Sequence, residues 1–215
     1  MLLLVNCTVK NKILVSAIPR LRHALRTLHI PFYEVRGPHV QPEVMDPASS
    51  IHKNITGIII SGSSMKLSKI GKDISKYVYI LHYLRLFQHV PVLGICFGAQ
   101  LLLALYGGVL IDNHVYTRES VEIQVLKSHK LFRHPTQLSP ANQKSTIIAS
   151  FHFSDIPVIT NHRRIKPIAW AIGNTSSLPV AYEFERGRVY GCLFHPELNT
   201  DTYYILKNTF ISPSL

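Results

Sequence analysis

Three residues of this 215-residue chain have the types and the spacing of a thiol catalyst. Cys96 stands between Gly94 and Gly98, directly after one short apolar run and directly before a longer one. His195 and Glu197 are separated by a single proline. A thiol nucleophile needs a base, and the base needs a group that orients it. We therefore predict Cys96 as nucleophile, His195 as base and Glu197 as orienting carboxylate, because alternate residues of an extended chain point to the same side.

The glycines around Cys96 are typical of a strand that turns into a helix within a residue or two. Such an elbow tolerates no bulk on either side and holds its middle residue in a strained, outward-pointing conformation. The helix N-terminus would favour a thiolate, and the N–H of Phe97 could donate to an oxyanion. An alternative stays open, in which Cys96 is a small buried hydrophobe and Gly94 and Gly98 only pack the helix on the sheet.

The His195 motif has its own alternatives. The chain contains twelve histidines, so His195 could be a surface residue beside a solvated Glu197. A zinc site is not expected, because the P-C-x-x-C that accompanies H-x-E in zinc deaminases does not follow.

The first half of the chain alternates short apolar runs with helical patterns. Strands are expected at residues 2–6, 31–35, 55–61 and 90–95, and helices at 16–28, 73–88 and 97–106. Asp73 is expected to cap its helix and Val78 to face inward, whereas the turn-rich residues 37–50 are expected to form a loop. This order predicts an α/β fold with a doubly wound, mostly parallel central sheet and helices on both faces.

From residue 109 to 185 the pattern changes. Segments such as 121–126, 146–153 and 167–172 are rich in β-formers, which predicts an added region of mixed or antiparallel strands. A strand at 188–194 and a helix at 201–210 follow. Without a visible linker, one domain over residues 1–215 is expected. Cys96 and His195 both follow predicted strands and should meet at the carboxyl edge of the sheet.

The composition excludes several classes of protein. Hydrophobic residues make up 47% and charged residues 16%, against a usual value of about 25%, which excludes a disordered chain. Three widely spaced cysteines exclude a disulfide framework and indicate a reducing compartment, hence the cytoplasm. The net charge of +11 favours an anionic partner, yet no recognition motif for nucleic acid accompanies the basic residues near 163–166, so a solvated surface or a docking face explains them as well.

One stretch has the length of a membrane span. Residues 91–111 contain no charge, but Pro91 and internal glycines interrupt them, so we interpret the stretch as strand, elbow and helix. The N-terminus lacks the basic region of a signal peptide. No membrane association is therefore expected.

Two longer motifs together resemble the class I glutamine amidotransferases. They are PVLGICFGAQLLLALYGG at 91–108 and GCLFHPE at 191–197. Shorter patches at 2–6, 58–64, 117–123 and 150–155 extend the likeness over residues 2–205. Among the branches of the family, the pattern is most similar to the glutaminase part of guanosine monophosphate synthase.

The resemblance implies a reaction. Cys96 would attack the side-chain amide of glutamine, with His195 transferring protons and Glu197 orienting it. A glutamyl thioester would form, ammonia would leave and water would release glutamate, without a metal or organic cofactor. A separate synthetase subunit would use the ammonia, because the chain contains no nucleotide-binding glycine motif.

The resemblance also implies binding residues. Backbone N–H groups of Phe97 and of the turn at Gly62 and Ser63 would hold the oxyanion. The glutamine would be bound by Gln100 and by the segment Phe151, His152 and Phe153. The chain departs from the family's usual pattern at Ser63, where a second glycine is common, and at Asn6, where aspartate is common.

Two other functions remain compatible with this pattern. One is a γ-glutamyl hydrolase or peptidase without an ammonia acceptor. The other is a catalytically weak member that acts as a binding or regulatory protein.

Overall fold

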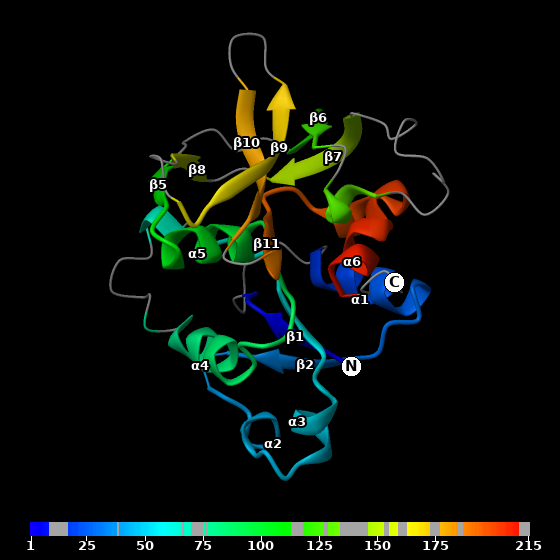
Figure 1. The fold of residues 1–215 in the computed structure, drawn as a ribbon, viewed down its shortest axis with the longest axis vertical. Coiled ribbons are helices and arrows are strands. Elements are labelled where there is room, and N and C mark those ends of the chain that lie inside the picture. The colour runs from blue at the N-terminus through cyan, green and yellow to red at the C-terminus, as the bar shows by residue number, and fades with distance from the viewer. Residues whose placement is uncertain are drawn as a thin grey trace.

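A β-sheet with helices on both faces forms the centre of the computed structural model (Figure 1). The structure describes residues 1–8, 17–37, 39–65, 67–69, 75, 77–112, 118–126, 129–133, 146–152, 155–158, 163–172, 177–184 and 187–210. The strands of this sheet are Leu2–Asn6 (β1), Phe32–Arg36 (β2), Gly57–Ile60 (β3), Val92–Ile95 (β4), Arg118–Val125 (β6), Thr146–His152 (β7), Lys166–Ile172 (β9), Ser177–Glu183 (β10) and Val189–Cys192 (β11). In the described part of the chain they lie in the order β2-β1-β3-β4-β11-β10-β9-β6-β7.

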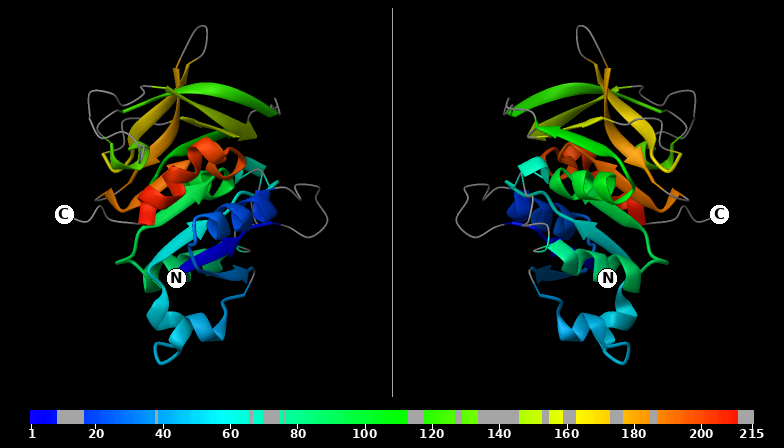
Figure 2. Two further views of the ribbon diagram at one scale, coloured as in Figure 1. Left: turned by 90° about the vertical axis from the view of Figure 1, so that its right-hand side faces the viewer. Right: turned by 90° about the vertical axis from the view of Figure 1, so that its left-hand side faces the viewer.

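The half of the sheet from β2 to β11 is parallel throughout. Its strands β1, β3 and β4 are buried along their whole length, which is why they read as continuous apolar runs. The helices α1 (Ala17–Thr27) and α6 (Tyr203–Phe210) cover one face, and α4 (Val78–Leu86) and α5 (Phe97–Leu105) cover the other (Figures 1 and 2). The predicted α/β architecture is thus confirmed.

The other half of the sheet is antiparallel. Strands β10, β9, β6 and β7 each pair antiparallel with their neighbours and form the upper part of the molecule in Figure 1. Beside them, β5 (Val109–Asp112) and β8 (Asp155–Val158) form a separate antiparallel pair. This confirms the predicted addition of antiparallel strands after residue 109.

The expectation of a loop over residues 37–50 is wrong in part. Two short helices, α2 (Pro42–Met45) and α3 (Ser50–Asn54), lie in and just after this stretch. The hydroxyl of Ser49 accepts a hydrogen bond from the N–H of His52 and so caps α3. Helices of one turn are too short to show an apolar period, so the pattern could not reveal them.

The expectation that Val78 faces inward is also wrong, although Tyr77, expected to face inward as well, is buried. The helix begins at Val78, which is 42% exposed, and its buried residues are Tyr79, Ile80 and Tyr83. Tyrosine can face inward here because its hydroxyl finds a partner: that of Tyr83 accepts a hydrogen bond from the N–H of Gln41 at 2.8 Å. Asp73, expected as the cap, lies outside the described residues.

The long uncharged stretch folds as strand, elbow and helix. Residues 91–111 contain β4, α5 and most of β5. Within the residues described, no helix has the length and apolar character needed to cross a membrane.

Close backbone approach explains both glycines beside Cys96. A Cβ on Gly94 would lie 2.6 Å from the carbonyl carbon of Gly98, and a Cβ on Gly98 would overlap the carbonyl oxygen of Ile60. Helix α5 therefore rests directly on strands β3 and β4, which fixes where the helix begins.

We expect Gly98→Ala to lower the free energy of unfolding by about 1 to 3 kcal/mol, because backbone must move to admit the methyl group. Chemical denaturation would measure it. Ala104→Ser, at an exposed position of the same helix, is the control and should change stability by less than about 0.5 kcal/mol. Equal stability of the Gly98→Ala and control variants would contradict the packing described.

Candidate functional site

Cys96 occupies the turn between β4 and α5 in a strained conformation. Its φ and ψ are 52° and −105°, a region that non-glycine residues rarely adopt. Its N–H donates to the carbonyl of Cys192 at 2.7 Å, and its own carbonyl accepts from the N–H of Gln100 at 3.0 Å. Cys96 thus precedes the first turn of α5, as expected of a nucleophile elbow.

His195 and Glu197 form a buried pair just beyond β11. Nδ1 of His195 donates to Oε1 of Glu197 over 2.7 Å, and the side chains are 3% and 1% exposed. The N–H of His195 donates to the carbonyl of Ser150 at 2.8 Å, which ties it to β7. The hydroxyl of Thr202 donates to the carbonyl of Pro196 at 2.8 Å and braces the short turn that carries Glu197. The alternative of a surface histidine beside a solvated carboxylate is therefore wrong.

The turn after β3, which contains Gly62, lies against both Cys96 and His195. A Cβ on Gly62 would lie 3.1 Å from Cε1 of His195 and 3.5 Å from Cβ of Cys96. The turn after β3, the thiol and the imidazole therefore converge at the carboxyl edge of the parallel strands. The hydroxyl of Ser63 accepts from the N–H of Met65 at 3.3 Å, within its own turn.

The charges around His195 oppose the effect of its burial. Burial by itself lowers the pKa of His195, but the charges of Glu197 and Cys96 and their hydrogen bonds to the ring outweigh it and raise the pKa above its usual value. The imidazole is therefore best described as a proton donor held between a carboxylate and a sulfur.

The other two cysteines are core residues. Burial raises the pKa of the Cys7 thiol to about 12 and also raises that of Cys192. Both side chains are buried and neither is in a disulfide. These two thiols are therefore not expected to react at neutral pH.

The residues predicted to bind the oxyanion and the substrate include Phe97, Gln100 and Phe151. Phe97 is fully buried against the ring of Tyr77, with centroids 4.9 Å apart. Gln100 is 2% exposed, one turn along α5 from Cys96. Phe151 pairs with Phe194 by an isolated bridge, so the end of β7 lies beside the segment that leads to His195.

Two predicted substrate-binding positions are described incompletely or not at all. The backbone of His152 ends β7, but its side chain and the whole of Phe153 lie outside the described residues. No group of three His, Cys, Asp or Glu side chains in the described ranges could hold a metal ion. The thiol of Cys96, the imidazole of His195, the carboxylate of Glu197 and nearby backbone groups make up the candidate site.

Sequence reasoning did not single out Ser61, which lies beside the site. It is 1% exposed and directly precedes Gly62. Its position just after an apolar strand, at the edge where Cys96 and His195 were expected, is the signal that could have identified it.

Comparisons with known proteins identify the family of this chain. A family model described as class-I glutamine amidotransferase matches residues 15–212. A GMP synthase [glutamine-hydrolyzing] of Borrelia garinii subsp. bavariensis is 33% identical over 158 residues, which are 72% of this chain and 26% of that relative. The chain thus spans about a quarter of this longer relative. A GMP synthase [glutamine-hydrolyzing] subunit of Methanococcus maripaludis is 29% identical over 195 residues, 89% of this chain and 88% of the relative.

Solved structures resemble the fold. A GMP synthase subunit protein of Thermoplasma acidophilum superposes with a TM-score of 0.69 at 19% identity, over 97% of this chain and 91% of the other. A glutamine amidotransferase of Thermotoga maritima gives a TM-score of 0.63 at 15% identity, over 96% and 80%. The elbow at Cys96, the buried His195–Glu197 pair and the match over residues 15–212 lead to one assignment. This chain belongs to the class-I glutamine amidotransferase family.

Proposed function

We propose that the protein hydrolyses the side-chain amide of glutamine through a thioester on Cys96 and delivers the ammonia to a separate synthetase subunit. The observation that carries this proposal is the convergence of Cys96, Gly62 and the buried His195–Glu197 pair at one edge of the sheet.

The first half of the reaction forms the thioester. The thiolate of Cys96, at the N-terminus of α5, attacks the amide carbon of glutamine. Backbone N–H groups of Phe97 and Ser63, with Gly62 leaving room for the tetrahedral centre, hold the developing oxyanion. His195 gives its proton to the nitrogen, the C–N bond breaks and ammonia leaves.

The second half releases glutamate. His195, now neutral, takes a proton from water, and the oxygen attacks the thioester carbon. The C–S bond breaks and the Cys96 thiolate returns. Glu197 keeps Nδ1 of His195 protonated throughout, so that Nε2 exchanges the proton. Gln100 and the backbone from Phe151 to Phe153 are the proposed contacts to the bound glutamine.

The proposed partner follows from the relatives. Those that this chain covers over most of their length are named as glutamine-hydrolysing subunits of GMP synthase, and longer relatives named GMP synthase contain a region outside the match. We therefore propose that ammonia passes to the synthetase subunit of a two-subunit GMP synthase. The chain carries a net charge of +11, and we propose that its basic surface docks an acidic partner.

Glutamine turnover with and without a synthetase subunit tests this function. We expect ammonia and glutamate in equal amounts, at a rate that rises at least about tenfold when the synthetase and its substrates are present. Coupled enzymatic detection of both products would measure it. A rate of glutamine hydrolysis that does not change when the synthetase is added, together with cleavage of γ-glutamyl peptides, would favour the hydrolase alternative. Absence of turnover in every mixture would favour the binding-protein alternative.

A further inference from the structure

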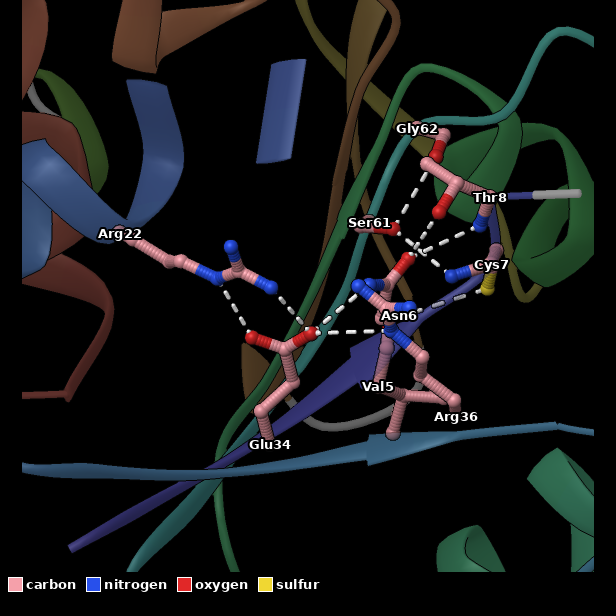
Figure 3. A network of polar contacts seen from close by, with 9 residues as sticks. All are labelled: Val5, Asn6, Cys7, Thr8, Arg22, Glu34, Arg36, Ser61 and Gly62. Atoms are coloured by element: carbon pink, nitrogen blue, oxygen red, sulfur yellow. Dashed lines mark hydrogen bonds and ion pairs between the residues drawn. The ribbon is translucent and has the colours of Figure 1, made fainter. Parts of the chain in front are cut away.

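The hydroxyl of Ser61 connects two backbone groups beside the site. It accepts a hydrogen bond from the N–H of Cys7 at 2.9 Å and donates one to the carbonyl of Gly62 at 3.0 Å (Figure 3). Ser61 is 1% exposed, so water does not compete for either bond. Because an N–H can only donate, the bond from Cys7 leaves the Ser61 proton to the carbonyl of Gly62.

The bond to Gly62 fixes the orientation of one peptide group. In a planar trans peptide, the N–H points opposite to the carbonyl. While Ser61 holds the carbonyl of Gly62, the N–H of Ser63 must lie in the same plane and point in the opposite direction. Turned over, the same peptide would present a carbonyl oxygen in place of an N–H and would repel an oxyanion. Gly62 lies against both Cys96 and His195, so this orientation matters at the reacting atoms.

The Cys7 N–H is itself held in place by a network at the end of β1. Oδ1 of Asn6 accepts from the N–H and the hydroxyl of Thr8 at 3.0 and 2.6 Å, which shapes the chain through Cys7. Nδ2 of Asn6 donates to Glu34 at 2.8 Å, and Arg22 donates to the same carboxylate through two bonds of 2.7 Å (Figure 3).

This network requires a hydrogen-bond donor at position 6, which the amide of Asn6 supplies. Burial raises the pKa of Glu34, but the bonds from Arg22 and Asn6 outweigh it and keep the pKa below its usual value. Glu34 is therefore a carboxylate and needs donors. An aspartate at position 6 would place a second carboxylate against it, whereas the amide of Asn6 donates to it.

We infer that Ser61 is a positioning residue for the oxyanion site: its hydroxyl, held by the Cys7 N–H, orients the Gly62–Ser63 peptide so that the Ser63 N–H can stabilise a tetrahedral intermediate on Cys96. The inference rests on the proposed function, because it assumes an acyl transfer to Cys96.

Two reactions of the same thiol separate this role from a general structural one. Acetylation of Cys96 by p-nitrophenyl acetate passes through an oxyanion, whereas alkylation by iodoacetamide does not. In Ser61→Ala we expect the acetylation rate to fall about 10- to 100-fold and the alkylation rate to stay within about twofold. Mass spectrometry of the Cys96 peptide would measure both rates.

Ser64→Ala is the matched control. It makes the same chemical change in the same turn, at a hydroxyl that forms no hydrogen bond with the residues described. Both of its rates should equal those of the unaltered protein. Equal loss of the two rates in Ser61→Ala, or no loss of either, would overturn the inference.

Glutamine hydrolysis measured in parallel keeps the two proposals distinct. An unaltered protein that is acetylated but never turns over glutamine, even with the synthetase, would refute the proposed function while the Ser61 comparison still stands. An unaltered protein that is not acetylated at all would refute both.

Discussion

Cys96→Ala is expected to lower the rate of glutamine hydrolysis by at least about 10,000-fold. Cys96 is the thiol at the N-terminus of α5, in a backbone conformation that presents it beside His195 and Gly62. Without sulfur no thioester can form, and the oxyanion donors alone would leave only a small residual rate. Ammonia release from glutamine would measure the loss, in the presence of the synthetase if the isolated protein is slow.

Cys192→Ala is the matched control for this change. The backbone carbonyl of Cys192 accepts a hydrogen bond from the N–H of Cys96, and the substitution keeps this bond. Its side chain is buried in the core, so the variant should lose some thermal stability but keep its activity within a few-fold. Retained hydrolysis in Cys96→Ala, or an equal loss in Cys192→Ala, would contradict the role proposed for Cys96.

The parts of the fold that could be predicted are those with a strong local signal. Strands such as Gly57–Ile60 are buried on both faces, so burial selects a run of apolar residues that is visible in the sequence. The elbow was predictable because backbone crowding at Gly94 and Gly98 excludes a Cβ. Only glycine lacks a Cβ, so the crowding is visible in the sequence as two glycines. His195 and Glu197 were predictable because two positions in extended chain already share a side.

Features that depend on distant neighbours could not be predicted. The buried face of α4 is set by what surrounds Tyr79 and Tyr83, and the partner of Tyr83 is a backbone N–H at Gln41, 42 residues away. The role of Ser61 likewise requires that β1 and β3 lie side by side, which places Cys7 next to it. The sequence shows that Ser61 follows an apolar strand at the expected edge of the site, but its bond to Cys7 becomes visible only with the register of the strands.

Glu197→Gln is expected to slow glutamine hydrolysis about 100- to 10,000-fold. It should also narrow the range of pH over which the enzyme is active, by lowering the alkaline limit. The carboxylate lies 2.7 Å from Nδ1 of His195 and is among the groups that raise its pKa. Glutamine fills the same space without the charge, so the pKa of His195 should fall. Because a protonated imidazole is then lost at lower pH, the alkaline limb of the pH–rate profile should move down by at least about one unit.

A second histidine–carboxylate pair in the same molecule supplies the control. Nε2 of His129 lies 3.2 Å from Oε2 of Glu183, on the antiparallel side of the sheet and among residues that have no part in the proposed chemistry. Glu183→Gln removes the same charge from a histidine and should leave both the rate and the alkaline limb unchanged. If both variants shifted the limb equally, the effect would come from net charge rather than from Glu197. If neither did, His195 would not need its carboxylate, and the pair would be a feature of packing alone.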